Sequence, residues 1–182
     1  SYEFNKNGDF LVFVSHKTID KKDVYQIHLY DFKEKEGHDF STEFYKIESK
    51  LFNDEGNQFA FMASTDTSKE TRLYNVYSWD VNKEMPTVLF DDTRADVANS
   101  LTVSPKSTLR FSKDGSRLFF GLYDKPEEEP KDTLLDTEKA KLDIWHYQDK
   151  RLQPQQLKEL KKDQDKSLLT VLHLNDNKLV QL

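Results

Sequence analysis

One short turn motif occurs three times in this chain of 182 residues. In each copy a Phe is followed by Asn or Ser, a glycine comes four places after the Phe, and an apolar stretch follows. The copies occupy residues 4–13, 52–61 and 111–120, and their glycines, Gly8, Gly56 and Gly115, lie 48 and 59 residues apart. A repeat of roughly 40–50 residues is typical of β-propeller blades. The chain is therefore expected to repeat one β-hairpin unit.

These repeats predict an all-β fold, a partial β-propeller of about three four-stranded antiparallel blades with one short helical insertion. Aromatic residues make up 13% of the chain, which favours strands. We expect a single propeller fragment over residues 1–182. Blade one covers 1–44, blade two covers 45–92, and blade three covers 104–182 with a loop and helix insertion at 124–166.

The apolar and polar stretches place the strands of the first two blades. In blade one, Phe10–Ser15 is apolar on both faces, which predicts an inner strand packed on two sides. Lys17–Asp23 is polar and is expected to be a loop. Further strands are expected at 24–32, 38–41, 45–52, 58–64, 73–81 and 87–90.

Blade three departs from the repeat. Strands are expected at 108–111 and 117–123, and a final hairpin at 168–174 and 178–182. The segment 124–141 holds two prolines around three glutamates, which predicts an exposed loop. A short strand is expected at 142–147. Gln153–Asp165 is the one good helix candidate, with Pro154 in its first turn and Leu157 and Leu160 on one face.

Composition excludes several classes of function. The net charge of −6 argues against a nucleic-acid partner, which requires a basic face. The chain has no Cys, so it has no disulfide and no Cys-based metal site. No apolar run approaches the roughly 18–20 residues of a membrane-spanning helix. The chain starts at Ser1 and ends at Leu182 within an expected strand, and we therefore expect it to be a piece of a longer protein.

The residues offer few candidates for a chemical site. The Asp- and Asn-rich turns lack the alternating ligands of a calcium loop and are expected to be hairpin turns. None of the histidines forms a metal-binding pair, and we expect none to act as a ligand or a base. No serine stands in a G-x-S-x-G turn, so no nucleophile is expected. The acidic loop 124–139 is either a contact surface or, as we expect, solvated. The histidines are His16, His28, His38, His146 and His173.

The repeated motif F-[SN]-x-x-G-x-x-[FL]-x-F, followed by a strand such as Leu73–Asp80, resembles the blades of the TolB and prolyl-oligopeptidase families. No copy contains the proline of the S-P-D-G turn of those families. The stretches Leu142–Tyr147, Leu152–Gln156 and Leu172–Leu174 resemble the N-terminal propeller region of bacterial S9-family serine peptidases, the prolyl oligopeptidase and dipeptidyl-peptidase group. The resemblance covers nearly the whole chain.

The S9 resemblance implies a non-catalytic segment that gates peptide access to a hydrolase domain outside this chain. In that family the catalytic triad lies in a C-terminal α/β-hydrolase domain, so no catalytic, cofactor-binding or metal-ligating residue is assigned here and no cofactor is expected. The implied partners are that hydrolase domain and the peptide substrate. The resemblance also implies a periplasmic or secreted bacterial protein.

Two alternatives stay open at this point. One is a TolB-like sensor or scaffold propeller that acts in protein–protein interaction. The other is a self-contained enzyme, which requires a convergent pocket that the sequence does not reveal. Because the end blades of an incomplete propeller leave apolar faces uncovered, we also expect the isolated chain to self-associate or to be marginally stable.

Overall fold

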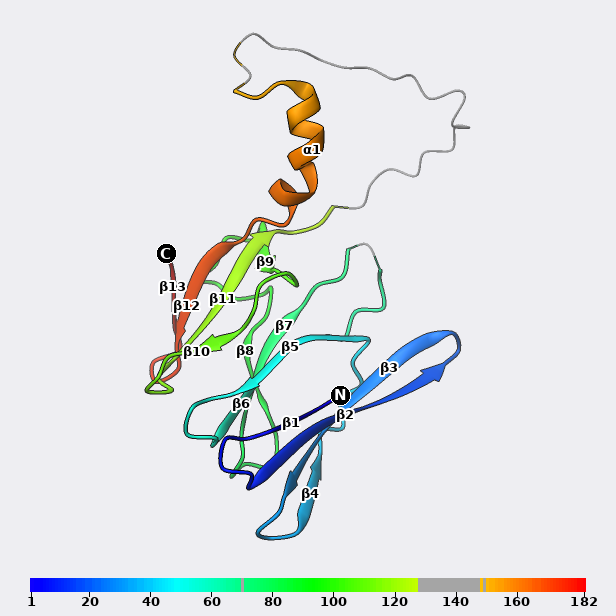
Figure 1. Ribbon diagram of the computed structural model, residues 1–182, viewed down its shortest axis with the longest axis vertical. Coiled ribbons are helices and arrows are strands. Elements are labelled where there is room, and N and C mark those ends of the chain that lie inside the picture. The colour runs from blue at the N-terminus through cyan, green and yellow to red at the C-terminus, as the bar shows by residue number, and fades with distance from the viewer. Residues whose placement is uncertain (70, 128–147, 149) are drawn as a thin grey trace. The chain divides into compact units, whose positions relative to one another are not determined.

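Consecutive β-hairpins build nearly all of the chain that the computed structural model describes, which is residues 1–69, 71–127, 148 and 150–182 (Figure 1). The chain divides into one unit of residues 1–126 and 167–182 and a second unit of residues 127–166. The first unit contains three antiparallel sheets, which we call sheets A, B and C. The second unit contains the helix.

Sheets A and B are four-stranded meanders in which each strand pairs with the next along the chain. Sheet A consists of β1 (Tyr2–Phe4), β2 (Phe10–Ile19), β3 (Lys22–Asp31) and β4 (Glu36–Asp39). Sheet B consists of β5 (Lys46–Phe52), β6 (Gln58–Ser64), β7 (Asn75–Asp80) and β8 (Thr87–Phe90).

Sheet C repeats the meander with its first strand split in two. Both β9 (Leu101–Val103) and β10 (Arg110–Phe111) pair with β11 (Arg117–Asp124). The sheet then continues through β12 (Leu168–His173) and β13 (Lys178–Gln181). The expected blade of four strands therefore has a fifth short strand, because residues 104–109 leave the edge between β9 and β10. Ser49 Oγ, in the bulge of β5, accepts a hydrogen bond from the N–H of Leu109 in that loop, at 3.1 Å.

The repeated turn motif has the same hydrogen bonds in all three sheets. The second residue of each motif, which is Asn5, Asn53 or Ser112, accepts a bond from the glycine N–H through its carbonyl, at 3.0–3.1 Å. Its side-chain oxygen accepts a backbone N–H at the start of the following strand, at 3.0–3.1 Å. The glycines have φ between 68° and 75°, a region that L-residues rarely adopt. The motif therefore fixes each hairpin through local bonding.

Sheet B is packed on both faces, which explains why β6 is apolar along its length. Phe59, Phe61 and Ala63 lie in one core cluster with residues of sheet A. Ala60 and Met62, which point to the opposite face, lie in a second cluster with Leu118, Phe120 and Leu122 of sheet C. The three sheets thus pack face to face in the order of the chain, as blades of a propeller do. The expected all-β partial propeller is confirmed.

The prediction that Phe10–Ser15 packs on two sides is wrong. Val12 is fully buried against sheet B, whereas Phe13 on the opposite face is 37% exposed. Sheet A is the first of the three sheets, so no described sheet covers its outer face. The apolar sequence of β2 is that of an inner strand, but only one of its faces is covered.

The prediction of a loop at Lys17–Asp23 is also wrong. β2 and β3 continue to a two-residue turn at Asp20 and Lys21, whose φ values are 49° and 64°. Two successive positive φ values are those of a type I′ hairpin turn, which usually carries Asn-Gly. Polar cross-strand contacts such as Thr18 Oγ1 to Asp23 Oδ1 (3.0 Å) extend the hairpin beyond the apolar stretch.

The second unit contains α1 (Gln153–Gln164), with Pro154 in its first turn, as the sequence predicts. No residue of α1 is buried, and Leu157 and Leu160 are exposed. The guanidinium of Arg151 bridges Glu159 and Asp163 at 2.7 Å each, so ion pairs lie along the surface of the helix. The expected strand at 142–147 lies outside the described residues, as does most of the acidic loop.

Candidate functional site

Sheet A brings together three residues that no sequence motif connects. Ser15 Oγ lies 2.8 Å from His28 Nε2, and His28 Nδ1 lies 2.6 Å from Asp39 Oδ1. The three side chains come from β2, β3 and the end of β4, and all stand on the outer face of the sheet. This is the order of contacts in a Ser-His-Asp catalytic triad.

The surroundings of Ser15 do not match those of a catalytic serine. β2 pairs with β3 along its whole length, and the adjacent N–H of Val14 donates to the carbonyl of Ser1 at 2.8 Å. The N–H of Val14 is therefore occupied and cannot stabilise an oxyanion. The Asp39 side chain is 77% exposed, so water competes for the carboxylate. We interpret the chain of contacts as one that provides a partner for each ring nitrogen of His28.

A search for G-x-S-x-G could not have found this chain of contacts. The contacts follow from the two-residue turn at Asp20 and Lys21, which sets the register of the whole β2–β3 hairpin and which no usual turn residue marks in the sequence. That register places His28 opposite Phe13 and next to Ser15 on one face.

The other described histidines are dispersed. His16 Nε2 lies 3.0 Å from Asp23 Oδ1, and this hydrogen bond lowers the pKa of Asp23. His38 and His173 lie in β4 and β12, in different sheets. His146 lies outside the described residues. Within the described ranges no three His, Asp or Glu residues group as a metal site would require.

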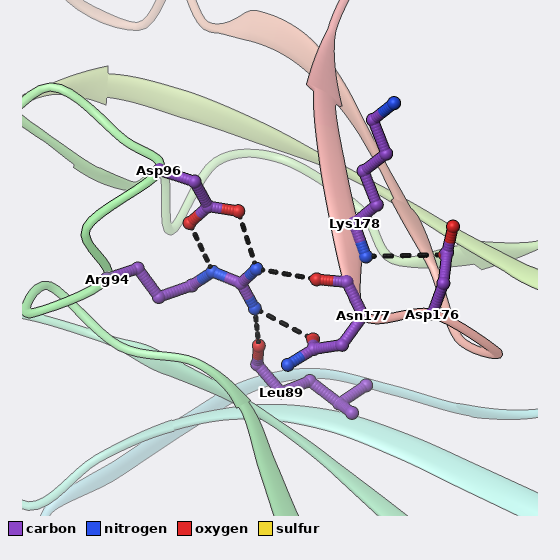
Figure 2. A network of polar contacts seen from close by, with 6 residues as sticks. All are labelled: Leu89, Arg94, Asp96, Asp176, Asn177 and Lys178. Atoms are coloured by element: carbon purple, nitrogen blue, oxygen red, sulfur yellow. Dashed lines mark hydrogen bonds and ion pairs between the residues drawn. The ribbon is translucent and has the colours of Figure 1, made fainter.

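A polar network joins sheet B to sheet C around Arg94 (Figure 2). The Arg94 guanidinium forms a bidentate pair with Asp96, at 2.8 Å from Nε and 2.7 Å from Nη2. It also donates to the carbonyl of Leu89 at the end of β8 (2.8 Å) and to both oxygens of Asn177 in the β12–β13 turn (2.8 and 2.9 Å). Arg94 thus connects segments 83 residues apart in sequence.

A cavity of about 390 Å³ lies at this network, lined by residues 88–91, 94–96 and 177. Guanidinium groups in cavities often bind anions, but Arg94 has five N–H donors and makes five hydrogen bonds here. The bonds to Asp96 raise the pKa of Arg94 and lower that of Asp96. A ligand anion would have to displace Asp96, so we interpret the network as a clamp between sheets.

No helix within the described residues combines the length and apolar character needed to cross a membrane.

Comparisons with known proteins find likeness at the level of structure only. No family model matches the sequence, and no curated protein does. Among solved structures, TolB from Acinetobacter baumannii is similar with a TM-score of 0.48 and 12% identity, over 100% of this chain and 31% of that one. The tricorn protease is similar with a TM-score of 0.44 and 9% identity, over 100% and 22%.

A third similar structure is the β-propeller domain of the Trilobed protease from Pyrococcus furiosus, with a TM-score of 0.40 and 14% identity, over 96% of this chain and 54% of that one. The chain thus spans between about a fifth and about half of the length of these three structures. Since every TM-score is below 0.5, the fold assignment depends on the three stacked sheets of this chain.

Proposed function

We propose that this chain is a non-catalytic propeller segment of a larger S9-type serine peptidase, in which its blades shape and limit the access of peptides to a hydrolase domain outside the chain. The observation that carries the proposal is the stack of three sheets that pack in chain order, in which no sheet of the described residues covers the outer face of sheet A. Such a stack is a unit of a larger circular or linear array. A periplasmic or secreted location belongs to the same proposal.

The described residues support a non-catalytic role in two ways. The Ser15–His28–Asp39 chain lies on the outer face of sheet A, with the exposed Asp39 carboxylate in competition with water and the N–H of Val14 already bonded to Ser1. The Arg94 guanidinium uses its hydrogen-bonding capacity within the protein. Both groups thus have structural explanations, and the chemistry of peptide hydrolysis is assigned to a domain elsewhere.

The proposal is tested by a fluorophosphonate probe, which forms a covalent bond with an activated serine. The natural gene product that contains this chain and the chain alone are labelled side by side, with Ser15→Ala of both as a control. We expect labelling of the full protein, unchanged in Ser15→Ala, and none of the chain alone. Labelling that disappears in Ser15→Ala would show a catalytic centre in sheet A.

A second candidate function is a sensor or scaffold propeller that binds another protein. The exposed aromatic residues on the outer face of sheet A favour it, since contiguous apolar patches mark interaction surfaces. A full-length protein that no serine probe labels and that cleaves no prolyl or dipeptidyl substrate would support this candidate over the first.

A further inference from the structure

Two copies of the turn motif contain a dipeptide in which a side chain can react with its own main chain. Asn7 precedes Gly8 in sheet A, and Asp114 precedes Gly115 in sheet C; no other Asn or Asp of the sequence is followed by glycine. A glycine has no side chain to hinder the approach of its nitrogen to the Cγ atom of the preceding residue. The two dipeptides can be compared directly, because they occupy the same position of one motif.

Asn7 is exposed, and the equivalent positions show that this exposure belongs to the motif. Glu55 and Asp114 take the place of Asn7 in sheets B and C. Both are exposed, although a preceding sheet packs against sheet B and against sheet C. A sheet that precedes sheet A in a longer protein would therefore leave Asn7 open to water in the same way.

Asp114 is held by three hydrogen bonds. Its carboxylate accepts the hydroxyl groups of Ser112 (2.5 Å) and Ser116 (2.8 Å) and the N–H of Ser116 (3.2 Å). The bond from Ser112, followed by those from Ser116, lowers the pKa of Asp114 to about 2. An ionised carboxylate offers no good leaving group to an attacking nitrogen, so this copy of the motif resists the reaction.

The Asn7 side chain lacks such partners. The places of the two serines are taken by Asn5, whose side-chain oxygen and nitrogen both bond elsewhere, and by Asp9, which has no hydroxyl to donate. Among the residues that the structure describes, none forms a hydrogen bond with the Asn7 side chain. The neutral amide of Asn7 therefore keeps its carbonyl carbon open to attack.

The closed turn restrains the attacking nitrogen. The N–H of Gly8 donates to the carbonyl of Asn5 at 3.1 Å, so this nitrogen is engaged while the turn is closed. The reaction requires a local opening of the turn, of the kind that folded proteins undergo without global unfolding. The bond from Asn5 Nδ2 to the carbonyl of Gly56 opposes that opening, because it ties the turn to sheet B.

We propose that Asn7 is a site of spontaneous deamidation, with water as the co-reactant. In the opened turn the Gly8 nitrogen attacks Cγ of Asn7, the bond between Cγ and the side-chain nitrogen breaks, and ammonia leaves with the proton of the Gly8 N–H. Water then opens the resulting cyclic imide at either of its two carbonyl groups. The products are aspartate and isoaspartate, each of which adds one negative charge.

Isoaspartate in place of Asn7 weakens the contact between sheets A and B. The main chain then passes through the former Cγ atom and is one carbon longer, which displaces the Gly8 N–H from the carbonyl of Asn5. The side chain of Asn5 is positioned by this turn, and it supplies the bond to Gly56 of sheet B. Deamidation is therefore expected to lower the stability of the fold.

The test is incubation of the folded chain at mildly alkaline pH, with peptide mapping by mass spectrometry at intervals. Fragmentation that cleaves the main chain distinguishes isoaspartate from aspartate. Asn99, which is exposed and is followed by serine, serves as the internal control.

Three variants separate the elements of the argument. Asn7→Glu introduces the residue that sheet B has at this position and removes the reactive amide. Asn5→Ser removes the bond that ties the turn to sheet B. The double change Ser112→Ala and Ser116→Ala removes both hydroxyl groups that hold Asp114. Far-UV circular dichroism verifies that each variant is folded.

We expect Asn7 of the folded wild-type chain to convert to isoaspartate and aspartate, while Asn99 and Asp114 stay intact over the same time. Asn5→Ser should convert Asn7 several-fold faster, and the double serine variant should form isoaspartate at Asp114. The isoaspartate form, separated by anion exchange, should unfold at lower urea concentration than the unmodified chain, whereas Asn7→Glu should keep its stability during incubation.

Two results would overturn the proposal. In the first, Asn7 converts in the urea-unfolded chain but stays intact in the folded chain, which would show that the turn does not open enough to react. In the second, Asp114 or Asn99 of the folded wild-type chain converts as fast as Asn7, which would show that the hydrogen bonds and the glycine do not decide reactivity.

Discussion

The side chain of Asn5 serves the local turn and the contact between sheets at once, and this double role can be separated by mutation. Asn5 is 4% exposed. Its Oδ1 accepts the N–H of Phe10 at 3.0 Å, and its Nδ2 donates to the carbonyl of Gly56 in sheet B at 3.1 Å. Asn5→Ala removes both bonds and leaves one donor and one acceptor without partners.

The structure gives a magnitude for each loss. A net hydrogen bond contributes about 0.5–1.5 kcal/mol, and an unpaired buried group costs about 1–3 kcal/mol. We therefore expect Asn5→Ala to lower the free energy of unfolding by about 2–4 kcal/mol. Asn5→Ser keeps an acceptor for Phe10, as Ser112 Oγ accepts the N–H of Arg117 at 3.0 Å. It loses only the bond to Gly56, so its expected cost is about 1–2 kcal/mol.

Urea unfolding measures these differences. The free energies of unfolding are compared between variants whose unfolding free energy depends equally steeply on urea concentration. Lys6→Ala, at the exposed neighbouring position, is the control and should change the free energy of unfolding by less than about 0.5 kcal/mol. If Asn5→Ala changes the free energy of unfolding by no more than this control does, the double role of Asn5 is refuted. Asn5→Ser as stable as the wild type would show that the bond between the sheets contributes nothing.

Three further predictions use the same measurement. Phe61→Ala should cost about 3–5 kcal/mol, because Phe61 is fully buried, and Phe13→Ala at the equivalent position should cost clearly less; equal costs would contradict the open face of sheet A. The double change Asp20→Asn and Lys21→Gly should stabilise the chain by about 0.5–1 kcal/mol, because both residues have positive φ; destabilisation would contradict the turn assignment. The hydrogen bond to Arg94 lowers the pKa of Asp96 below 3.8, the ordinary value for an Asp. The Asp96 carboxylate should therefore stabilise the fold fully above pH 3.8, and this stabilisation should decline as the pH falls further. The stability difference from Asp96→Asn should shrink in that range, and a difference independent of pH would refute the ion pair.

The parts of the fold that could be predicted are those specified by local residues. The bounds of β6 and β8 match the prediction residue for residue, because a motif glycine and apolar runs mark their ends. The turn at Asp20 and Lys21 could not be predicted, since neither residue is a usual choice for positive φ and the pairing around it is polar. The exposure of Phe13 depends on which sheet covers β2, and no local pattern contains that information.

Less of the candidate sites could be predicted. The contact between Ser15 and His28 follows from the register of the β2–β3 hairpin, and no usual turn residue marks the turn that sets this register. The Arg94 clamp joins a loop after β8 to Asn177, and such a contact arises only when sheets B and C pack. The sequence shows that the chain has no G-x-S-x-G motif. It does not show that a serine and a histidine are hydrogen-bonded on one strand face.

The pairing of Leu122 with Leu168 brings together two residues between which the chain makes an excursion of more than forty residues. All other strand connections within the sheets are short, so the repeat is complete without this excursion. The entropic cost of closing a loop grows only with the logarithm of its length. The end of the β11–β12 hairpin is therefore a permissive junction, at which segments of very different size can be exchanged while the register of sheet C stays the same.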